Sequence, residues 1–259
     1  MRTGRSPAPL TVIRRAAVAA LLIIPVMACT AADLTVSAAA SLTNAFRALA
    51  PGFEAQNPGT TVQFNFAASD PLLAQIAKGA PVDVFASADQ ETMDRAAGQK
   101  LLLPDSRRNF VANTLVLITP VDSALGIASL ADLRQAGIKR IALGKPEGVP
   151  AGRYAKAALE AAGLWSALTD KAIYAQNVRQ ALDYVARAEV DAGFVYETDA
   201  LLQKDKVRIV VKVETETPIR YPVAALAASA NPEASLKFIR YLETPAAQAV
   251  FARFGFRRP

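Results

Sequence analysis

A short apolar segment, Leu34–Ser37, runs almost directly into a serine that begins an amphipathic pattern. The segment has the composition of a strand, and apolar residues recur at helical spacing after Ser41 as far as Phe53. The start of a helix presents unpaired backbone N–H groups and the positive end of the helix dipole, and the Ser41 hydroxyl adds another donor. Such a junction can hold an anion without any cationic side chain.

The same succession of strand and helix continues along the chain and predicts an α/β fold. Further strands are expected at 62–66, 82–86, 115–119, 138–143, 192–195, 207–211 and 221–227. Helices are expected at 70–77, 89–97, 153–162, 178–187, 233–242 and 246–254, with one more begun by Ser129. This alternation implies mostly parallel sheets with helices on both faces and ligands outside the carboxyl ends of the strands.

The composition excludes several kinds of chemistry. The chain of 259 residues is 52% hydrophobic, which suits one large or two modest globular domains. It contains no histidine, so a Ser-His-Asp triad, a Cys-His pair and most zinc sites are ruled out. The sequence also lacks an Asp-rich cation loop, and we expect no cofactor.

The net charge of +6 does not indicate a nucleic-acid partner. Four arginines lie in the first 32 residues, which contain no acidic residue, and the remainder carries 25 basic and 23 acidic groups. We therefore expect no binding of nucleic acid.

The N-terminus resembles an export signal. Its arginines precede the apolar run Ala16–Met27, which is too short to span a bilayer, and small residues follow. We expect residues 1–32 to be cleaved and a soluble periplasmic protein to begin at Asp33. In the alternative, Cys29, the only cysteine, carries a lipid anchor.

Five motifs resemble those of the periplasmic molybdate-binding proteins of ABC importers, in the order and spacing of that family. They are AAASLTNAF at 38–46, GAPVDVFASAD at 79–89, VPAGRYAK at 149–156, NVR at 177–179 and GFVYETD at 193–199. The resemblance implies a two-lobed type II periplasmic-binding-protein fold, with two crossing strands as its hinge. We expect one lobe at 33–115 plus 224–259 and the other at 116–223, with crossings at Asn113–Pro120 and Tyr221–Ala227.

The resemblance also implies a set of ligand contacts. In that family a tetrahedral oxyanion, molybdate and also tungstate, is held by neutral hydroxyl and backbone N–H donors, without direct coordination of the metal. The positions that match are Ser41, Ser69, Ala151, Val178 and Tyr196. The first four lie at expected starts of helices, and Tyr196 follows the end of a strand.

Charged residues near these motifs have simpler interpretations. Asp70-Pro71 departs from the small hydroxyl residues usual in the family after Ser69, and we expect Asp70 to face solvent and cap a helix. Arg179 is expected to be solvated or ion-paired. Asp89 is expected to cap the following helix and Asp83 to tie the end of a strand.

The resemblance implies a monomeric solute-binding protein that delivers molybdate to an ABC permease with its ATPase. Three alternatives stay open: a receptor for sulfate or another tetrahedral anion, an extracytoplasmic sensor partner, and an enzyme on the same scaffold. The enzyme lacks a visible nucleophile paired with a base.

Overall fold

The computed structural model describes residues 1, 3, 4 and 32–259, and residues 32–259 belong to one compact unit. The expected cleavage site and Cys29 lie outside the described residues, so these expectations stay predictions. Within the described part of the chain, no helix combines the length and the apolar character needed to cross a membrane.

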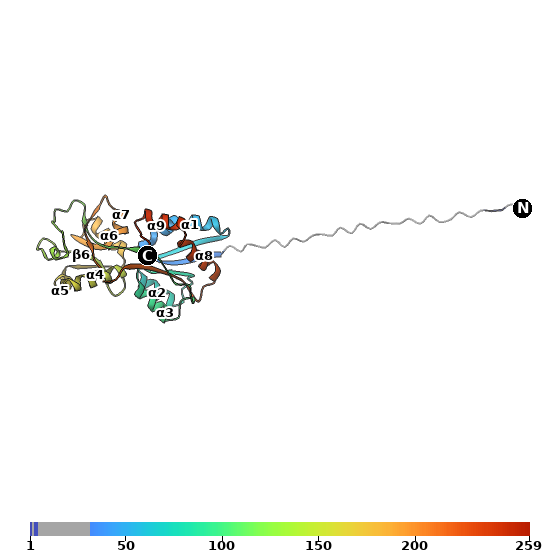
Figure 1. The fold of residues 1–259 in the computed structure, drawn as a ribbon, viewed down its shortest axis with the longest axis horizontal. Coiled ribbons are helices and arrows are strands. Elements are labelled where there is room, and N and C mark those ends of the chain that lie inside the picture. Colours follow the sequence, from blue (N-terminus) through green and yellow to red (C-terminus); the bar gives the residue numbers. More distant parts are fainter. Residues whose placement is uncertain (2, 5–31) are drawn as a thin grey trace. The chain divides into compact units, whose positions relative to one another are not determined.

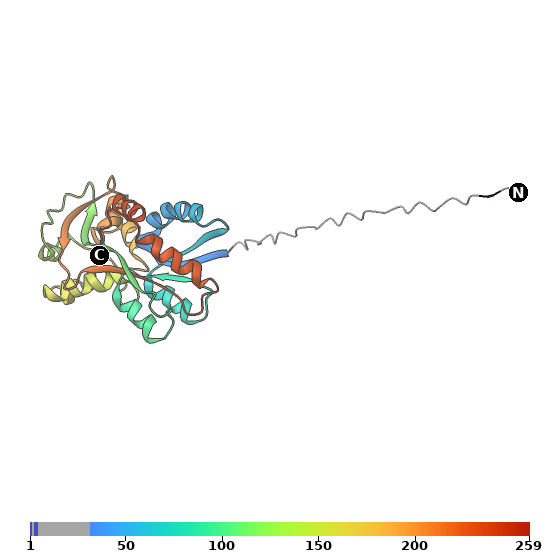
Figure 2. The same ribbon diagram turned by 45° about the vertical axis from the view of Figure 1, so that its right-hand side comes forward.

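The compact unit contains two five-stranded sheets (Figures 1 and 2). The first sheet has the order β2-β1-β3-β10-β4, and the second has the order β7-β6-β8-β5-β9. The first is built from β1 (Ala32–Ala39), β2 (Thr60–Ala67), β3 (Val84–Ala86), β4 (Arg108–Asn113) and β10 (Ile219–Ala225). The second is built from β5 (Leu115–Pro120), β6 (Ile141–Gly144), β7 (Ala172–Ala175), β8 (Ala192–Tyr196) and β9 (Val207–Val213).

Helices cover both faces of each sheet (Figure 1). The first sheet carries α1 (Thr43–Gln56), α2 (Ser69–Ala77), α3 (Gln90–Gly98), α8 (Pro232–Leu242) and α9 (Pro245–Arg253). The second carries α4 (Pro150–Ala161), α5 (Trp165–Leu168), α6 (Val178–Ala186) and α7 (Glu197–Leu202). We call each sheet with its helices a lobe, the first and the second.

The expected fold class is confirmed, although the sheets are more mixed than predicted. β1 pairs in parallel with β2 and β3, and β6 pairs in parallel with β7 and β8. In contrast, β10 runs antiparallel to β3 and β4, and β5 runs antiparallel to β8 and β9. The two strands that run against their neighbours, β5 and β10, are the first strands that the chain forms after it passes from one lobe to the other. The chain thus enters each sheet in the direction opposite to that of the parallel strands.

The chain passes between the lobes twice. It leaves the first sheet after β4 and enters the second at β5, with Thr114 between them, which agrees with the expected crossing at Asn113–Pro120. It returns through residues 214–218, because β10 lies wholly in the first sheet. The return therefore precedes the expected Tyr221–Ala227. The expected lobe limits differ from the strand pairing at Leu115, which pairs in the second sheet, and at residues 219–223, which belong to the first.

The core of the first lobe shows why its central strand β3 is apolar throughout. In β3, Val84 and Ala86 belong to the main hydrophobic cluster, whereas Phe85 faces the cluster formed with α2 and α3. Alternate residues of a strand point to opposite faces, so a strand covered on both faces needs apolar side chains at each position. On the main-cluster side, the Phe46 ring lies 5.8 Å from that of Phe238 and 6.1 Å from that of Phe251, which joins α1 to α8 and α9.

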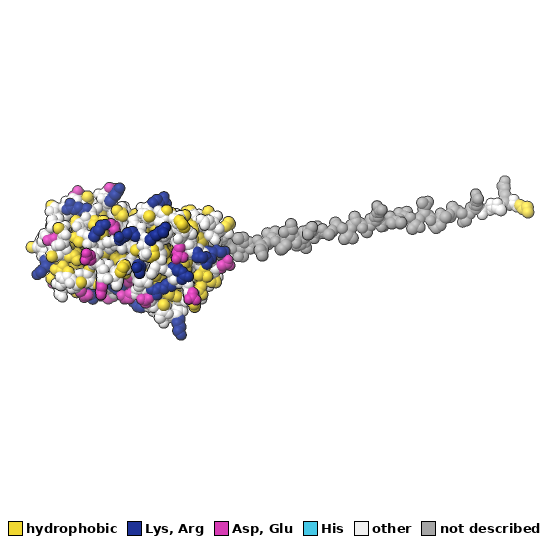
Figure 3. All heavy atoms as spheres, in the orientation of Figure 1, with side chains coloured by type: hydrophobic (Ala, Val, Ile, Leu, Met, Phe, Trp, Pro, Cys, Tyr) yellow, Lys and Arg dark blue, Asp and Glu magenta, His cyan; other side chains and the backbone are white. Residues whose placement is uncertain are grey.

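Basic and acidic side chains are intermingled on the face of the compact unit seen in Figure 3, without a broad area of one sign.

The local helix signals were largely correct. Asp89 caps α3 by accepting a hydrogen bond from the Thr92 N–H at 3.2 Å, and Ser129 forms a capping box with Asp132 at the start of a short 3₁₀ helix, Leu130–Arg134.

Candidate functional site

A small cavity of about 10 Å³ lies where the strand ends of the two sheets meet. It admits roughly one water-sized sphere, so entry of a larger solute requires the lobes to separate. All five residues predicted as ligand contacts line it, and both lobes contribute. The lining residues are Ala39, Ala40, Ser41, Ala68, Ser69, Ala88, Val149, Pro150, Ala151, Asn177, Val178 and Tyr196.

Ser41 reaches the cavity from the turn that follows β1. It lies in a 3₁₀ turn, Ala40–Leu42, that leads into α1, and it is 2% exposed. Its Oγ lies 2.9 Å from the Tyr221 Oη, which also accepts a hydrogen bond from Asn113 Nδ2 at 3.2 Å. Because Asn113 serves the Tyr221 oxygen, the tyrosine proton can go to Ser41, which leaves the Ser41 proton for a ligand.

Ser69 is the first residue of α2 and is fully buried. Its Oγ accepts a hydrogen bond from the Ala88 N–H at 3.0 Å. A hydroxyl that accepts one bond retains its own proton as a donor. Ser69 is therefore held in position by the loop after β3 and can donate toward the cavity.

Ala151 and Val178 lie in the first turns of α4 and α6, where N–H groups have no partner within the helix. Asn177 caps α6 through its side chain, which accepts hydrogen bonds from the N–H groups of Arg179 and Gln180, both at 3.0 Å. The cap serves the next two residues and not Val178. The N–H of Val178 thus remains at the cavity wall together with the positive end of the helix dipole.

Two glycines allow α4 to approach the end of β6 closely. A Cβ at Gly152 would lie 1.9 Å from the Gly144 carbonyl oxygen, a distance no side chain tolerates. This position therefore requires glycine, although its backbone conformation is helical. The close approach carries Ala151 to the edge of the second sheet and explains the glycine in the motif at 149–156.

Tyr196 ends β8 and is 1% exposed. Its Oη is buried and finds no hydrogen-bond partner among the described residues. Burial, followed by the electrostatic effect of Tyr221, raises the pKa of the Tyr196 phenol well above its ordinary value, so the group stays protonated. A buried unpartnered hydroxyl costs free energy, which a ligand that accepts its proton would recover.

Arg179 lies beside the cavity but directs its charge away from it. Its Nε pairs with Asp199 Oδ1 at 2.5 Å, and its Nη atoms donate to Asn44 Oδ1 at 2.9 Å and to the Ser41 carbonyl at 3.1 Å. The expected ion pair is confirmed. Burial raises the pKa of Asp199, and the Arg179 guanidinium opposes that shift.

Asp83 ties the start of β3 to its surroundings, as expected, by accepting hydrogen bonds from the Thr35 N–H at 2.8 Å and the Ser229 hydroxyl at 2.6 Å.

The expectation for Asp70 is wrong. Ala68 occupies the N-cap of α2, and no side chain caps that helix. Asp70 is instead 11% exposed at its side chain and pairs with Arg95 and Arg153. It is thereby neutralised and does not face the solvent.

A larger cleft of about 1520 Å³ lies elsewhere, along α4 and the segment between β9 and β10. None of the five predicted contacts lines it, and charged side chains of both signs are spread along its walls. The small cavity concentrates neutral donors from both lobes, and this convergence makes it the candidate site.

Among the described residues, no group of three or more acidic, cysteine or histidine side chains could hold a metal ion.

Sequence reasoning missed Tyr221 and Asn113, which support Ser41, and assigned no role to Arg153. Tyr221 lies 180 residues from Ser41 in the chain, so no local pattern connects them. Arg153 falls inside a recognised motif, and its two nearest acidic partners, Asp70 and Asp89, follow β2 and β3.

The two lobes, the hinge crossings and a cavity of donors between strand ends define the class of binding proteins that close around a solute. The chain belongs to the family of bacterial extracellular solute-binding proteins, whose model matches residues 34–257. It is 40% identical over 234 residues to the Escherichia coli molybdate-binding protein ModA, which covers 86% of this chain and 88% of the relative.

Two further likenesses agree with this assignment. A Bacillus subtilis protein with "ABC transporter substrate-binding lipoprotein" in its name is 36% identical over 225 residues, which are 86% of this chain and 85% of the relative. The solved structure of the Azotobacter vinelandii periplasmic molybdate-binding protein superposes with a TM-score of 0.76 at 26% identity, covering 87% of this chain and 99% of that one.

Proposed function

We propose that this solute-binding protein captures molybdate, and also tungstate, between its lobes and delivers it to an ABC permease. The observation that carries the proposal is the buried hydroxyl of Tyr196, which has no hydrogen-bond partner among the described residues and lies in a cavity lined by Ser41, Ser69, Ala151 and Val178. The E. coli and A. vinelandii relatives named for molybdate binding support the choice of ligand.

The donors suit a tetrahedral dianion. Two serine hydroxyls, one phenol and two N–H groups at helix starts converge from both lobes. Hydrogen bonds to a charged acceptor contribute about 1.5–3 kcal/mol each, so several can offset the desolvation of the anion. No bond is made or broken in this process; the lobes hold the solute and release it.

Closure follows from the division of the donors between the lobes. Ser41 and Ser69 belong to the first lobe, and Ala151, Val178 and Tyr196 belong to the second. An anion that contacts both sets has higher affinity for the closed form and shifts the population toward it. We place the hinge at Thr114 and at residues 214–218, where the chain passes between the sheets.

The other assignments in this proposal concern the cell. We propose a monomer that acts outside the cytoplasm, delivering to the permease and its ATPase. Anchoring through Cys29 is the alternative to a cleaved soluble form, and the lipoprotein among the relatives keeps that alternative open. Mass spectrometry of the exported protein distinguishes a chain that begins at Asp33 from one that begins at a lipid-modified Cys29.

The direct test is isothermal titration calorimetry of residues 31–259, the compact unit, with molybdate, tungstate, sulfate and phosphate in turn. We expect 1:1 binding of molybdate and tungstate and no heat from sulfate, because cavity size separates anions of equal charge. Preferential binding of sulfate would retain the fold and replace the ligand. Absence of binding by all four anions would overturn the proposal.

A further inference from the structure

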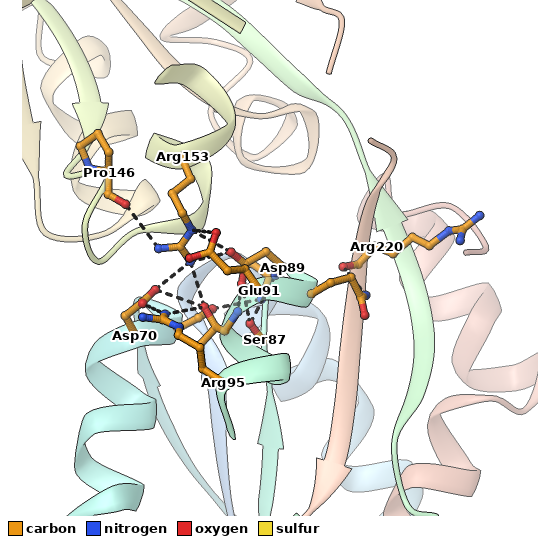
Figure 4. Close-up of polar contacts among 12 residues, drawn as sticks. Asp70, Ser87, Asp89, Glu91, Arg95, Pro146, Arg153 and Arg220 are labelled. Atoms are coloured by element: carbon orange, nitrogen blue, oxygen red, sulfur yellow. Dashed lines mark hydrogen bonds and ion pairs between the residues drawn. The ribbon is translucent and has the colours of Figure 1, made fainter. Parts of the chain in front are cut away.

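A cluster of charged side chains bridges the two lobes beside the anion cavity (Figure 4). Arg153 of α4, in the second lobe, reaches across to the start of α2 and α3 in the first. Its Nη2 lies 2.5 Å from Asp89 Oδ2 and 2.8 Å from Asp70 Oδ2, and it donates to Thr92 Oγ1 at 2.9 Å. The Nη2 atom alone thus contacts three side chains of the opposite lobe.

The contacts are largely shielded from water. The side chains of Arg153, Asp70 and Asp89 are 17%, 11% and 5% exposed. At this depth an ion pair is weakened less by salt than one on the surface. Glu91, whose side chain is 60% exposed, adds only an outer contact at 3.4 Å.

The two shielded acidic partners of Arg153, Asp89 and Asp70, each have a local partner that does not depend on closure. Asp89 caps α3 and accepts a hydrogen bond from the Ser87 hydroxyl at 3.1 Å. Asp70 pairs with Arg95 of α3, in the same lobe. Arg153 keeps a contact of its own, from Nη1 to the Pro146 carbonyl at 3.3 Å. Separation of the lobes therefore breaks the bridge but leaves both carboxylates held within the first lobe.

We propose that Arg153 is an interlobe latch that sets the affinity and the release rate of the bound oxyanion without touching it. Arg153 is not among the residues that line the anion cavity. Its bridge to Asp70 and Asp89 exists only in the closed form, so it adds to the stability of that form alone. The inference rests on the proposed function, because it assumes that an oxyanion closes the lobes.

The latch acts through the population of the closed form. When the open form predominates without ligand, a variant that lowers the equilibrium constant for closing of the lobes raises the apparent dissociation constant by the same factor. Removing one partner of a shielded, hydrogen-bonded charge pair acts mainly on the dissociation rate. Since Arg153 is partly exposed, we expect Arg153→Gln to weaken molybdate binding about 10- to 100-fold.

Two further variants make the test specific. Arg153→Lys keeps the charge but loses the planar fork that contacts two carboxylates, so its affinity should fall between those of Arg153→Gln and the unaltered protein. Arg107→Gln is the matched control, because it makes the same change of charge. Arg107 pairs with Asp94 at 2.6 Å within the first lobe and does not cross to the second.

The experiment combines calorimetry with a distance measurement. Residues 31–259 contain no native cysteine. Spin labels at Lys78→Cys, directly after α2, and at Ala161→Cys, the last residue of α4, both exposed positions, therefore report the distance between the lobes. At saturating molybdate the Arg153→Gln protein should reach the same short distance as the unaltered one. The latch changes the population of the closed form and not its geometry.

The outcomes separate the two proposals. Weaker binding in Arg153→Gln, intermediate binding in Arg153→Lys and unchanged binding in Arg107→Gln support the latch. Affinity of Arg153→Gln within twofold of the unaltered protein overturns the latch and leaves the proposed function intact. An equal loss in Arg107→Gln, or a saturated Arg153→Gln protein that stays open, also overturns it. If the unaltered protein binds no oxyanion, the proposed function itself fails.

Discussion

Replacement of Tyr196 by phenylalanine separates the role of its hydroxyl in binding from any role in folding. The Tyr196 Oη has no hydrogen-bond partner among the described residues, so its removal breaks no bond of the folded protein. Deleting a buried unsatisfied polar group is neutral or stabilising, by up to about 1 kcal/mol. We therefore expect the melting temperature of the ligand-free protein to stay constant or to rise slightly.

The same change removes one donor to a dianion. A hydrogen bond to a charged acceptor contributes about 1.5–3 kcal/mol, which corresponds to roughly a 10- to 150-fold rise in the dissociation constant for molybdate. Calorimetric titration measures that constant, and differential scanning fluorimetry measures stability on the same samples. The expected signature is a large loss of affinity without a loss of stability.

Tyr221→Phe provides the contrast. The Tyr221 Oη contacts Ser41 Oγ and accepts a hydrogen bond from Asn113, so its deletion leaves two buried polar groups short of a partner. We expect this variant to lose about 1–3 kcal/mol of stability. An unchanged dissociation constant in Tyr196→Phe, or an equal fall in stability in both variants, would refute the assignment of Tyr196 as a ligand donor.

Four other outcomes follow from the site. Ser69→Ala removes a donor and the acceptor of the Ala88 N–H, so affinity should fall about tenfold or more and stability by about 1 kcal/mol, measured by titration and chemical denaturation. Asp70→Ser should weaken molybdate binding rather than leave it unchanged, because Asp70 pairs with Arg153 across the lobes; unchanged titration curves would contradict this. Gly152→Ala should cost about 1–3 kcal/mol and displace the Ala151 N–H, since its Cβ meets the Gly144 carbonyl; equal stability on denaturation would argue against the close approach. Affinity should be constant from about pH 7 to 9, because burial raises the pKa of the Tyr196 phenol above its usual value of about 10 and the other donors do not titrate; a loss within that range would point to another group.

Local sequence patterns predicted most of the succession of strands and helices. Apolar runs flanked by helix-start residues placed β1, β2, β3 and β8, because buried strands and capped helices leave local signals. β4 and β7 were missed. β4 begins with Arg108 and Asn109, both exposed, and Ile173 and Tyr174 of the edge strand β7 are also exposed, so neither strand has the continuous apolar pattern of a central strand.

The candidate contacts came from the resemblance to the molybdate-binding family, and four of the five fall within its motifs: Ser41, Ala151, Val178 and Tyr196. That these five residues line one cavity, in contrast, was decided by the tertiary structure, which brings the strand ends of two sheets together. The support of Ser41 by Tyr221 and the bridge from Arg153 to Asp70 and Asp89 join residues 64 or more positions apart. Local patterns report which groups have unpaired donors or charges, but only the packing of the lobes decides which of those groups meet.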